Sequence, residues 1–186
     1  MTIRLGETED IDALSHIARY AFPDVLMWRK PRSLVRAWWQ AQLDDPGGEL
    51  WVCEDNGRVS GFCRLIESRQ DHYAMRRRFA GGPVTVLYLL VHCPGMVVLG
   101  GWKQVKLAVM RLCVRGSSAA PVDRLDNALW IRPIAVDPAA QSRGLGGRLL
   151  GKAKDRAKVH GRPLCASVKL QNRRALDFYS RNGFHE

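Results

Sequence analysis

The feature that most constrains this chain is a slip in hydrophobic alternation at Pro133. Apolar residues alternate with period two from Leu129 to Ile131, and the alternation resumes at Ile134, shifted by one residue. A one-residue slip leaves an extra residue unpaired, and proline has no N–H to donate to a β ladder. The pattern predicts a strand over 129–136 with a bulge at the proline.

A glycine-rich segment, Gln141 to Gly147, follows this strand and opens an amphipathic helix. Glycines let backbone N–H groups approach a ligand, and the start of a helix adds unpaired N–H groups and a positive dipole end. Arg143 and Arg148 flank the loop as candidate phosphate partners. We predict a polyphosphate site here. Two alternatives stay open: the glycines serve only a turn, and the arginines are only solvated charges. The buried stripe of the helix would be Leu145, Leu149, Leu150, Ala153 and Ala157.

The charge balance favours an anionic partner. The net charge is +11, and residues 141–186 hold eleven Lys and Arg against three Asp and Glu. Such clustering suits a polyanionic small molecule, but equally nucleic acid or a membrane surface. The five cysteines are scattered without a C-x-x-C pair, so neither a disulfide framework nor a metal site is expected. No signal peptide is visible at the N-terminus, which favours a cytoplasmic protein.

The other elements are expected at these positions: a strand over 2–5, a helix capped by Thr8 or Asp10 and ending near Phe22, a helix over 34–43 with Trp38 and Trp39 partly buried, a hairpin of strands 50–54 and 59–66 across Asn56-Gly57, a strand over 164–168 and a helix over 172–181 closed by Asn182-Gly183. The length suits a single domain over 1–186. Residues 69–126 are expected to form a helical insertion, although contact of 83–115 with a membrane surface, or a true span, stays open.

A second motif near the C-terminus matches a known superfamily. The segment from Asn172 to Phe184 fits N-x-x-A-x-x-x-Y-x-x-x-G-F, and 141–146 fits Q/R-x-x-G-x-G/A. Together, in this order, they resemble the GCN5-related N-acetyltransferase (GNAT) superfamily, most closely over 129–184. The resemblance implies an α/β (α+β) acyltransferase fold: a central, mixed, twisted sheet with a bulged, splayed strand, flanking helices and, in this chain, the helical insertion.

The resemblance also implies roles for residues of both motifs. Acetyl-CoA would be the cosubstrate, without a metal. Tyr179 would be the general acid that protonates the departing thiolate, although it could equally be a core aromatic. The cofactor-binding residues would be Ile134, Ala135 and Val136 on the pantetheine arm, Arg143, Gly144, Leu145, Gly146 and Gly147 on the pyrophosphate, with Gln141, Arg148 and Asn172 beside them.

Two departures from the family pattern stand out. Many members carry an acidic base on the bulged strand, where this chain has Trp130 and Arg132. Glu67, His72 and Asp126 are candidates from elsewhere, and a water chain is an alternative. The strands that usually follow G-F are expected to be missing after Phe184.

The sequence thus predicts an N-acetyltransferase that acts on a primary amine, favouring a small molecule, by direct attack in a ternary complex. A non-catalytic acetyl-CoA-binding protein and an enzyme that acts on a protein amine are the alternatives. A nucleic-acid binder is disfavoured, because no RNP, zinc-finger or basic-zipper pattern is present. A homodimer stays open.

Overall fold

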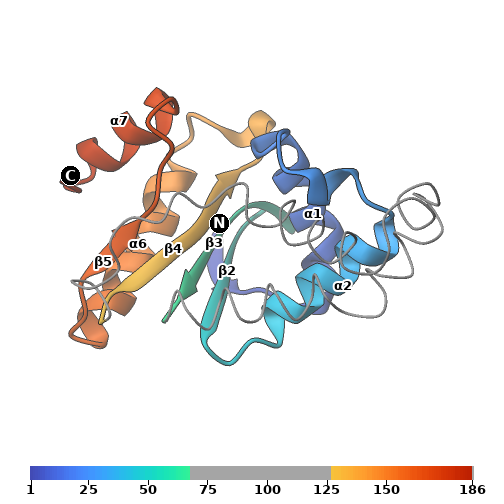
Figure 1. The fold of residues 1–186 in the computed structure, drawn as a ribbon, viewed down its shortest axis with the longest axis horizontal. Helices are drawn as coiled ribbons and strands as arrows, with labels where there is room; N and C mark the ends of the chain where they lie inside the picture. The colour runs from blue at the N-terminus through green and yellow to red at the C-terminus, as the bar shows by residue number, and fades with distance from the viewer. Residues whose placement is uncertain (68–126, 186) are drawn as a thin grey trace, which may run out of the picture.

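The computed structural model describes residues 1–67 and 127–185, which form a five-stranded sheet in the order β1-β2-β3-β4-β5. The first four strands are antiparallel neighbours and β5 runs parallel to β4, so the sheet is mixed as expected. Figure 1 shows the sheet between two groups of helices. The strands are β1 (Thr2–Leu5), β2 (Gly48–Asp55), β3 (Arg58–Ile66), β4 (Leu129–Val136) and β5 (Leu164–Ala166).

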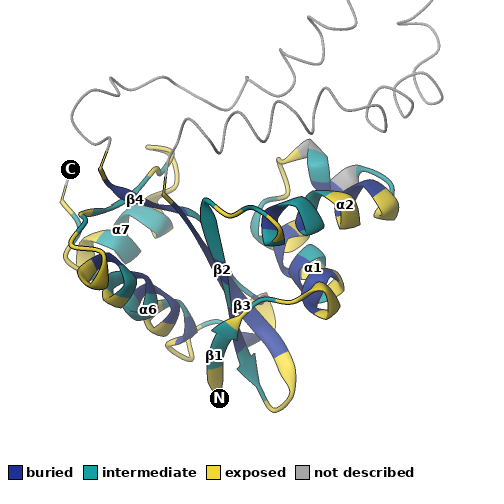
Figure 2. Ribbon diagram, turned by 90° about the horizontal axis from the view of Figure 1, so that it is seen from below, coloured by how far each residue is buried: buried dark blue, intermediate teal, exposed yellow. Residues whose placement is uncertain are grey.

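Helices cover both faces of the sheet. Helices α1 (Ile11–Ala21) and α2 (Arg32–Leu43) lie on one side, and α6 (Leu145–Val159) and α7 (Arg173–Arg181) lie on the other (Figures 1 and 2). Short 3₁₀ turns occupy η1 (Thr8–Asp10), η2 (Leu26–Arg29) and η3 (Pro138–Ala140). Among the described residues, no helix has the length and the apolar character that a membrane span requires. The expected insertion over 69–126, with its 83–115 stretch, lies outside the described residues.

The apolar stripes that define the helices pack where their spacing predicts. The inward positions of α1 repeat every three or four residues, and those of α6 do the same, so each helix turns one stripe toward the sheet. All five residues of the expected α6 stripe are buried. On the other face Trp39 is fully buried, whereas Trp38 is only partly buried. Figure 2 shows the buried band along the sheet-facing sides of α1 and α6.

The start of α1 differs from the expectation. Neither Thr8 nor Asp10 caps this helix with its side chain, because the chain first makes the 3₁₀ turn η1. The buried carboxylate of Asp10 instead accepts hydrogen bonds from both terminal nitrogens of Arg4, at 2.7 and 2.8 Å, and from the Glu7 N–H at 2.8 Å. The Asp10 carboxylate therefore completes a capping box with Glu7 at η1 and binds Arg4 of β1, instead of capping α1.

Strand boundaries are close to those expected. The β2–β3 hairpin turns at Asn56 and Gly57, which both have positive φ (51° and 73°), as the Asn-Gly pair predicts. Strand β5 ends at Ala166, two residues earlier than expected. The early end matters because the chain leaves β4 at that point.

A buried arginine fastens the α2–β2 connection to β3. The Arg64 side chain is fully buried, donates to the Gln42 carbonyl and pairs with Asp45, which follows α2. Burial lowers the pKa of Arg64 to about 10, although Asp45 opposes the shift, so the guanidinium stays charged at neutral pH. A Cβ at Gly48 would lie 2.7 Å from an Arg64 terminal nitrogen, and glycine is therefore required there.

Removing the Asp45 carboxylate should be costly. Asp45→Ala leaves the buried Arg64 cation without its counter-charge, and we expect the free energy of unfolding to fall by about 3 kcal/mol in urea denaturation. Asp44→Ala is the matched control, because the Asp44 carboxylate only accepts from Gln40 at the surface; it should change stability by less than about 0.5 kcal/mol. Equal, small losses in both variants would contradict the anchoring role of Arg64.

Candidate functional site

Strand β4 carries the expected bulge and opens the sheet beyond it. Its register with β3 passes from Cys63↔Ile134 to Leu65↔Ile131, so two β4 residues, Arg132 and Pro133, stand against one residue of β3. The Arg132-Pro133 peptide bond is cis. The parallel ladder with β5 covers only Leu129–Ile131. Among the strands of the described residues, Ile134–Val136 of β4 therefore pair with β3 alone, and the other edge of this segment is turned toward the gap at β5.

The glycine-rich loop lies directly after this open edge. Gly144 has a φ of +77° and is the N-cap of α6, whose first helical hydrogen bond runs from the Arg148 N–H to the Gly144 carbonyl. The N–H groups of residues 145–147 thus have no partner within the helix. A Cβ added at Gly144 or Gly147 would meet nothing within 4 Å. Open space, unpaired N–H groups and a helix dipole fit an anionic diphosphate.

The side chains beside the loop are tied to neighbouring elements. Gln141 donates to the Val136 carbonyl at 3.3 Å and accepts from Arg174 of α7 at 2.6 Å. Arg143 pairs with Asp55 at 2.6 Å, so it is not merely a solvated charge. Arg148 is exposed and reaches the Met1 sulfur at 3.1 Å.

Helix α7 brings the second motif against the same region. The Asn172 side chain caps α7 by accepting from the Ala175 N–H at 3.1 Å. Tyr179 packs in one hydrophobic cluster with Ile134 and Val136 of β4, edge-on to Phe178 and Phe184. Burial, with a smaller effect of the nearby Cys63 thiol, raises the pKa of Tyr179, so its hydroxyl is protonated at neutral pH.

Sequence reasoning missed the contribution of Phe178. A Cβ at Gly146 would lie 3.4 Å from the Phe178 ring, so this aromatic residue packs directly on the loop. The available signal was a second aromatic residue directly before Tyr179 in the same short helix.

Glu67, the candidate carboxylate within the described residues, does not lie at the open edge of β4. Glu67 follows the end of β3 that pairs with Trp130, pairs with Arg162 at 3.9 Å and is exposed. It therefore lies at the start of β4, at the opposite end from Val136. His72 and Asp126 lie outside the described residues.

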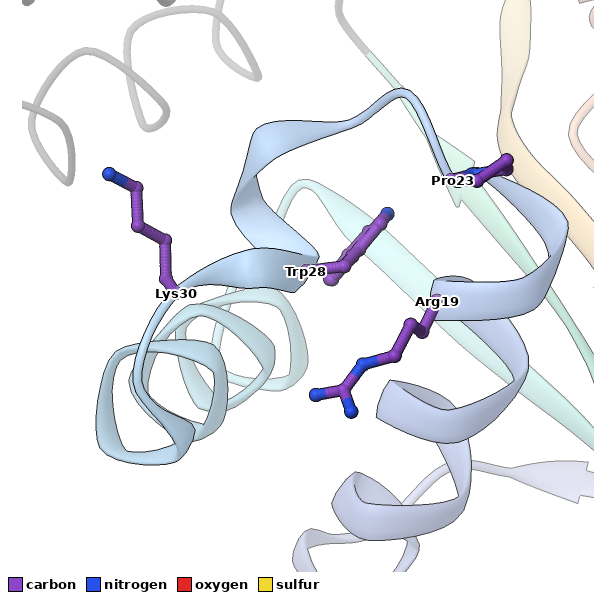
Figure 3. Close-up of a pocket in the computed structure, with 4 residues that line it drawn as sticks. All are labelled: Arg19, Pro23, Trp28 and Lys30. Carbon is purple, nitrogen blue, oxygen red and sulfur yellow. The ribbon is translucent and has the colours of Figure 1, made fainter.

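A hollow of about 400 Å³ lies on the α1 and α2 side, lined by Arg19, Pro23, Trp28 and Lys30. Figure 3 shows the indole between the Arg19 and Lys30 side chains, which extend in different directions. The Trp28 ring stacks on the Trp39 ring with 5.6 Å between ring centroids, and Trp39 packs edge-on to Phe62 with 5.2 Å between centroids. Phe62 is the β3 partner of Ala135. Buried aromatic side chains therefore lie between this hollow and β4 and separate the two.

Comparison with known proteins identifies the family. The family model described as an acetyltransferase (GNAT) domain matches residues 96–186, which include β4, the loop and α7. The curated "Uncharacterized N-acetyltransferase MJ1207" of Methanocaldococcus jannaschii is 42% identical over 57 residues, 30% of this chain. That match spans 25% of the relative's own length. These findings support membership of the GNAT superfamily.

Solved structures show that the whole GNAT fold is shared. AAC(6')-Iy, in complex with the bisubstrate analogue CoA-S-monomethyl-acetylneamine, has a TM-score of 0.62 at 11% identity, over 100% of this chain and 90% of the other. The aminoglycoside antibiotic 6'-N-acetyltransferase AAC(6')-IG of Acinetobacter haemolyticus has a TM-score of 0.60 at 10% identity, over 100% and 92%. At such identities the likeness concerns the fold alone.

A negative charge in the glycine-rich loop should greatly weaken the expected binding of acetyl-CoA. Gly146→Asp places a carboxylate beside the expected phosphates, and repulsion at about 5 Å is worth roughly 3 kcal/mol at an effective dielectric constant near 20. We expect acetyl-CoA affinity to fall by about 100-fold in calorimetric titration.

The control is Gly151→Asp, further along α6, where an added Cβ meets nothing within 4 Å. Its affinity should stay within about twofold of the parent. Retained affinity in Gly146→Asp would show that the loop does not hold the phosphates.

Proposed function

We propose that this protein transfers the acetyl group of acetyl-CoA to the primary amine of a small molecule by direct attack in a ternary complex. The observation that carries the proposal is the open edge of β4 beside the glycine-rich start of α6. An extended pantetheine arm can add to a free strand edge through backbone hydrogen bonds. The helix N-terminus at the end of that edge suits the pyrophosphate.

In this proposal each segment has a defined task. Backbone groups of Ile134, Ala135 and Val136 pair with the pantetheine arm, and N–H groups of residues 143–147 hold the pyrophosphate. A backbone N–H near Ala135 or Val136 donates to the thioester oxygen as negative charge develops there. The acceptor amine forms a bond to the carbonyl carbon and loses one proton to water. The carbon–sulfur bond breaks, Tyr179 gives its proton to the departing thiolate, and water restores the proton of Tyr179. The raised pKa of Tyr179 keeps its hydroxyl protonated at neutral pH but makes it a weaker acid, so this transfer depends on positioning rather than on acidity.

A small-molecule acceptor is favoured by the structural comparisons. Structures with the same fold include aminoglycoside 6'-N-acetyltransferases, which supports this substrate class without identifying the acceptor. The hollow at Trp28 does not contribute to this argument, because the buried Trp39 and Phe62 side chains separate it from Ala135.

A protein that binds acetyl-CoA without turnover is the second candidate. The observation in its favour is the position of Glu67, which leaves the candidate base at the far end of β4. This candidate predicts cofactor binding with no release of free thiol for any amine in a panel of amino sugars, polyamines and peptides.

Cofactor binding can be tested by thermal unfolding. A ligand at about 100 times its dissociation constant adds about 2.7 kcal/mol of stability, which corresponds to a rise of several degrees in the midpoint. We expect acetyl-CoA and CoA to raise the midpoint and ATP to leave it within about one degree. Equal shifts with all three would indicate a general polyanion site, and no shift with any would refute the proposal.

The role of Tyr179 can be tested by removing its hydroxyl. Tyr179→Phe keeps the aromatic packing with Phe178 and Phe184, and we expect kcat to fall by about 100-fold because the general acid is lost. The dissociation constant of CoA should change less than about twofold. Tyr20→Phe on the exposed face of α1 is the control and should leave both quantities unchanged. Parallel losses of binding and turnover in Tyr179→Phe would indicate a structural tyrosine.

A further inference from the structure

Two ion pairs join the turn of the β2–β3 hairpin to the segment between β4 and α6. In one pair the hairpin supplies the acid, and in the other it supplies the base. Asp55 at the end of β2 pairs with Arg143 at 2.6 Å, and Arg58 at the start of β3 pairs with Asp137 at 3.6 Å. Asp137 is buried, begins η3 and accepts from the Ala139 N–H. The hairpin thus contacts the segment near both of its ends.

The loop between those contacts adopts an unfavourable backbone conformation. Ser142 has a φ of +63° and Gly144 a φ of +77°, so the residues on either side of Arg143 are both left-handed. Glycine adopts this region without a steric penalty, but serine carries a Cβ that crowds the backbone. Such a residue persists only where its surroundings hold it in place.

The contacts that hold Ser142 come from its two neighbours in sequence. Gln141 is fixed by the Val136 carbonyl and by Arg174. Arg143 is fixed by Asp55. The Asp55 carboxylate is 13% exposed, whereas the Arg143 side chain is 55% exposed, so the anchor of this pair is the acid on the hairpin.

We propose that Asp55 is a positioning residue for cofactor binding: its ion pair with Arg143 holds the left-handed turn at Ser142, and thereby keeps the N–H groups of residues 143–147 aimed at the pyrophosphate. This inference rests on the proposed function, because it assigns a task to Asp55 only if the loop binds CoA. Asp55 touches no phosphate in this arrangement and acts through Arg143. An acid next to an anion site would otherwise weaken binding by repulsion, so the two effects of Asp55 have opposite signs.

If the loop adopts its binding conformation only part of the time, its measured affinity for CoA is lowered in proportion to the fraction of molecules in that conformation. Asp55→Asn keeps the shape of the side chain but removes its charge, so the turn is held less firmly. We expect the dissociation constant of CoA, measured by calorimetry on the full chain, to rise about fivefold. If repulsion were the larger effect, the same variant would bind CoA more tightly.

Ser142→Gly supplies the decisive second variant. Glycine adopts the left-handed conformation without the tether, so Ser142→Gly alone should bind CoA within about twofold of the parent. In that background, Asp55→Asn should weaken CoA binding by less than about twofold, which makes the two substitutions non-additive. A residue with a merely structural role would not be rescued by a glycine in another element.

Glu54→Gln is the matched control. Glu54 precedes Asp55 on β2 and pairs with Arg4 at 2.9 Å, so its loss removes an ion pair of similar exposure that does not touch the loop. It should leave the CoA dissociation constant unchanged. The unfolding midpoints of both variants should lie within a few degrees of one another.

The outcomes are separable. If the parent protein binds CoA and Asp55→Asn binds it equally or more tightly, the positioning role is refuted and the proposed function stands. An equal loss with and without the Ser142→Gly substitution also refutes it, because Asp55 would then act by another route. If the parent does not bind CoA, both proposals fail. Should Asp55→Asn not fold, Asp55→Ser removes the same carboxylate, and its loss of affinity must likewise shrink in the Ser142→Gly background.

Discussion

The unpaired edge of β4 is the constraint on which the rest of this structure depends. Backbone N–H and C=O groups must find partners, and a strand in the middle of a sheet normally finds them on both sides. The bulge at Arg132 and Pro133, with the early end of β5, leaves the second half of β4 paired with β3 alone. A strand edge inside a fold is a template for another extended chain, and the chemistry proposed here uses it in that way.

The helices on the two faces of the sheet determine what surrounds this edge of β4. The buried stripe of α6 fixes the helix against β3 and β4, which places its N-terminus directly after the open edge. On the opposite face, α1 and α2 bury Trp39 against Phe62 and leave the hollow beside Trp28. The loop between β4 and α6 receives contacts from three directions: the hairpin through Asp55, α7 through Arg174, and β4 itself through the Val136 carbonyl.

Sequence reasoning predicted most elements because their signals are local. The Asn56-Gly57 turn, the stripes of α1 and α6, and the bulge at Pro133 depend on residues close together in the chain. It was less accurate at the start of α1 and at Trp39. Asp10 is a residue type that caps helices, but its carboxylate accepts from Arg4 and from the Glu7 N–H of η1 instead of capping α1. The helical pattern predicts a partly buried Trp39, which is fully buried because η2 brings Trp28 against its ring.

The sequence alone determined the order of bulged strand, glycine-rich loop and helix, since this order depends on periodicity and on residue types at fixed spacing, and the resemblance of its two motifs to the GNAT superfamily implied the mixed α/β fold. Tertiary structure decided which side chains meet: Asp55 with Arg143, Phe178 with Gly146, and Tyr179 with the apolar cluster of β3, β4 and α6. Residues 55 and 143 are distant in the chain, and no local pattern records that a carboxylate on one hairpin will lie against an arginine in a loop. Such contacts follow from the register of the sheet, which is set only when the strands pair.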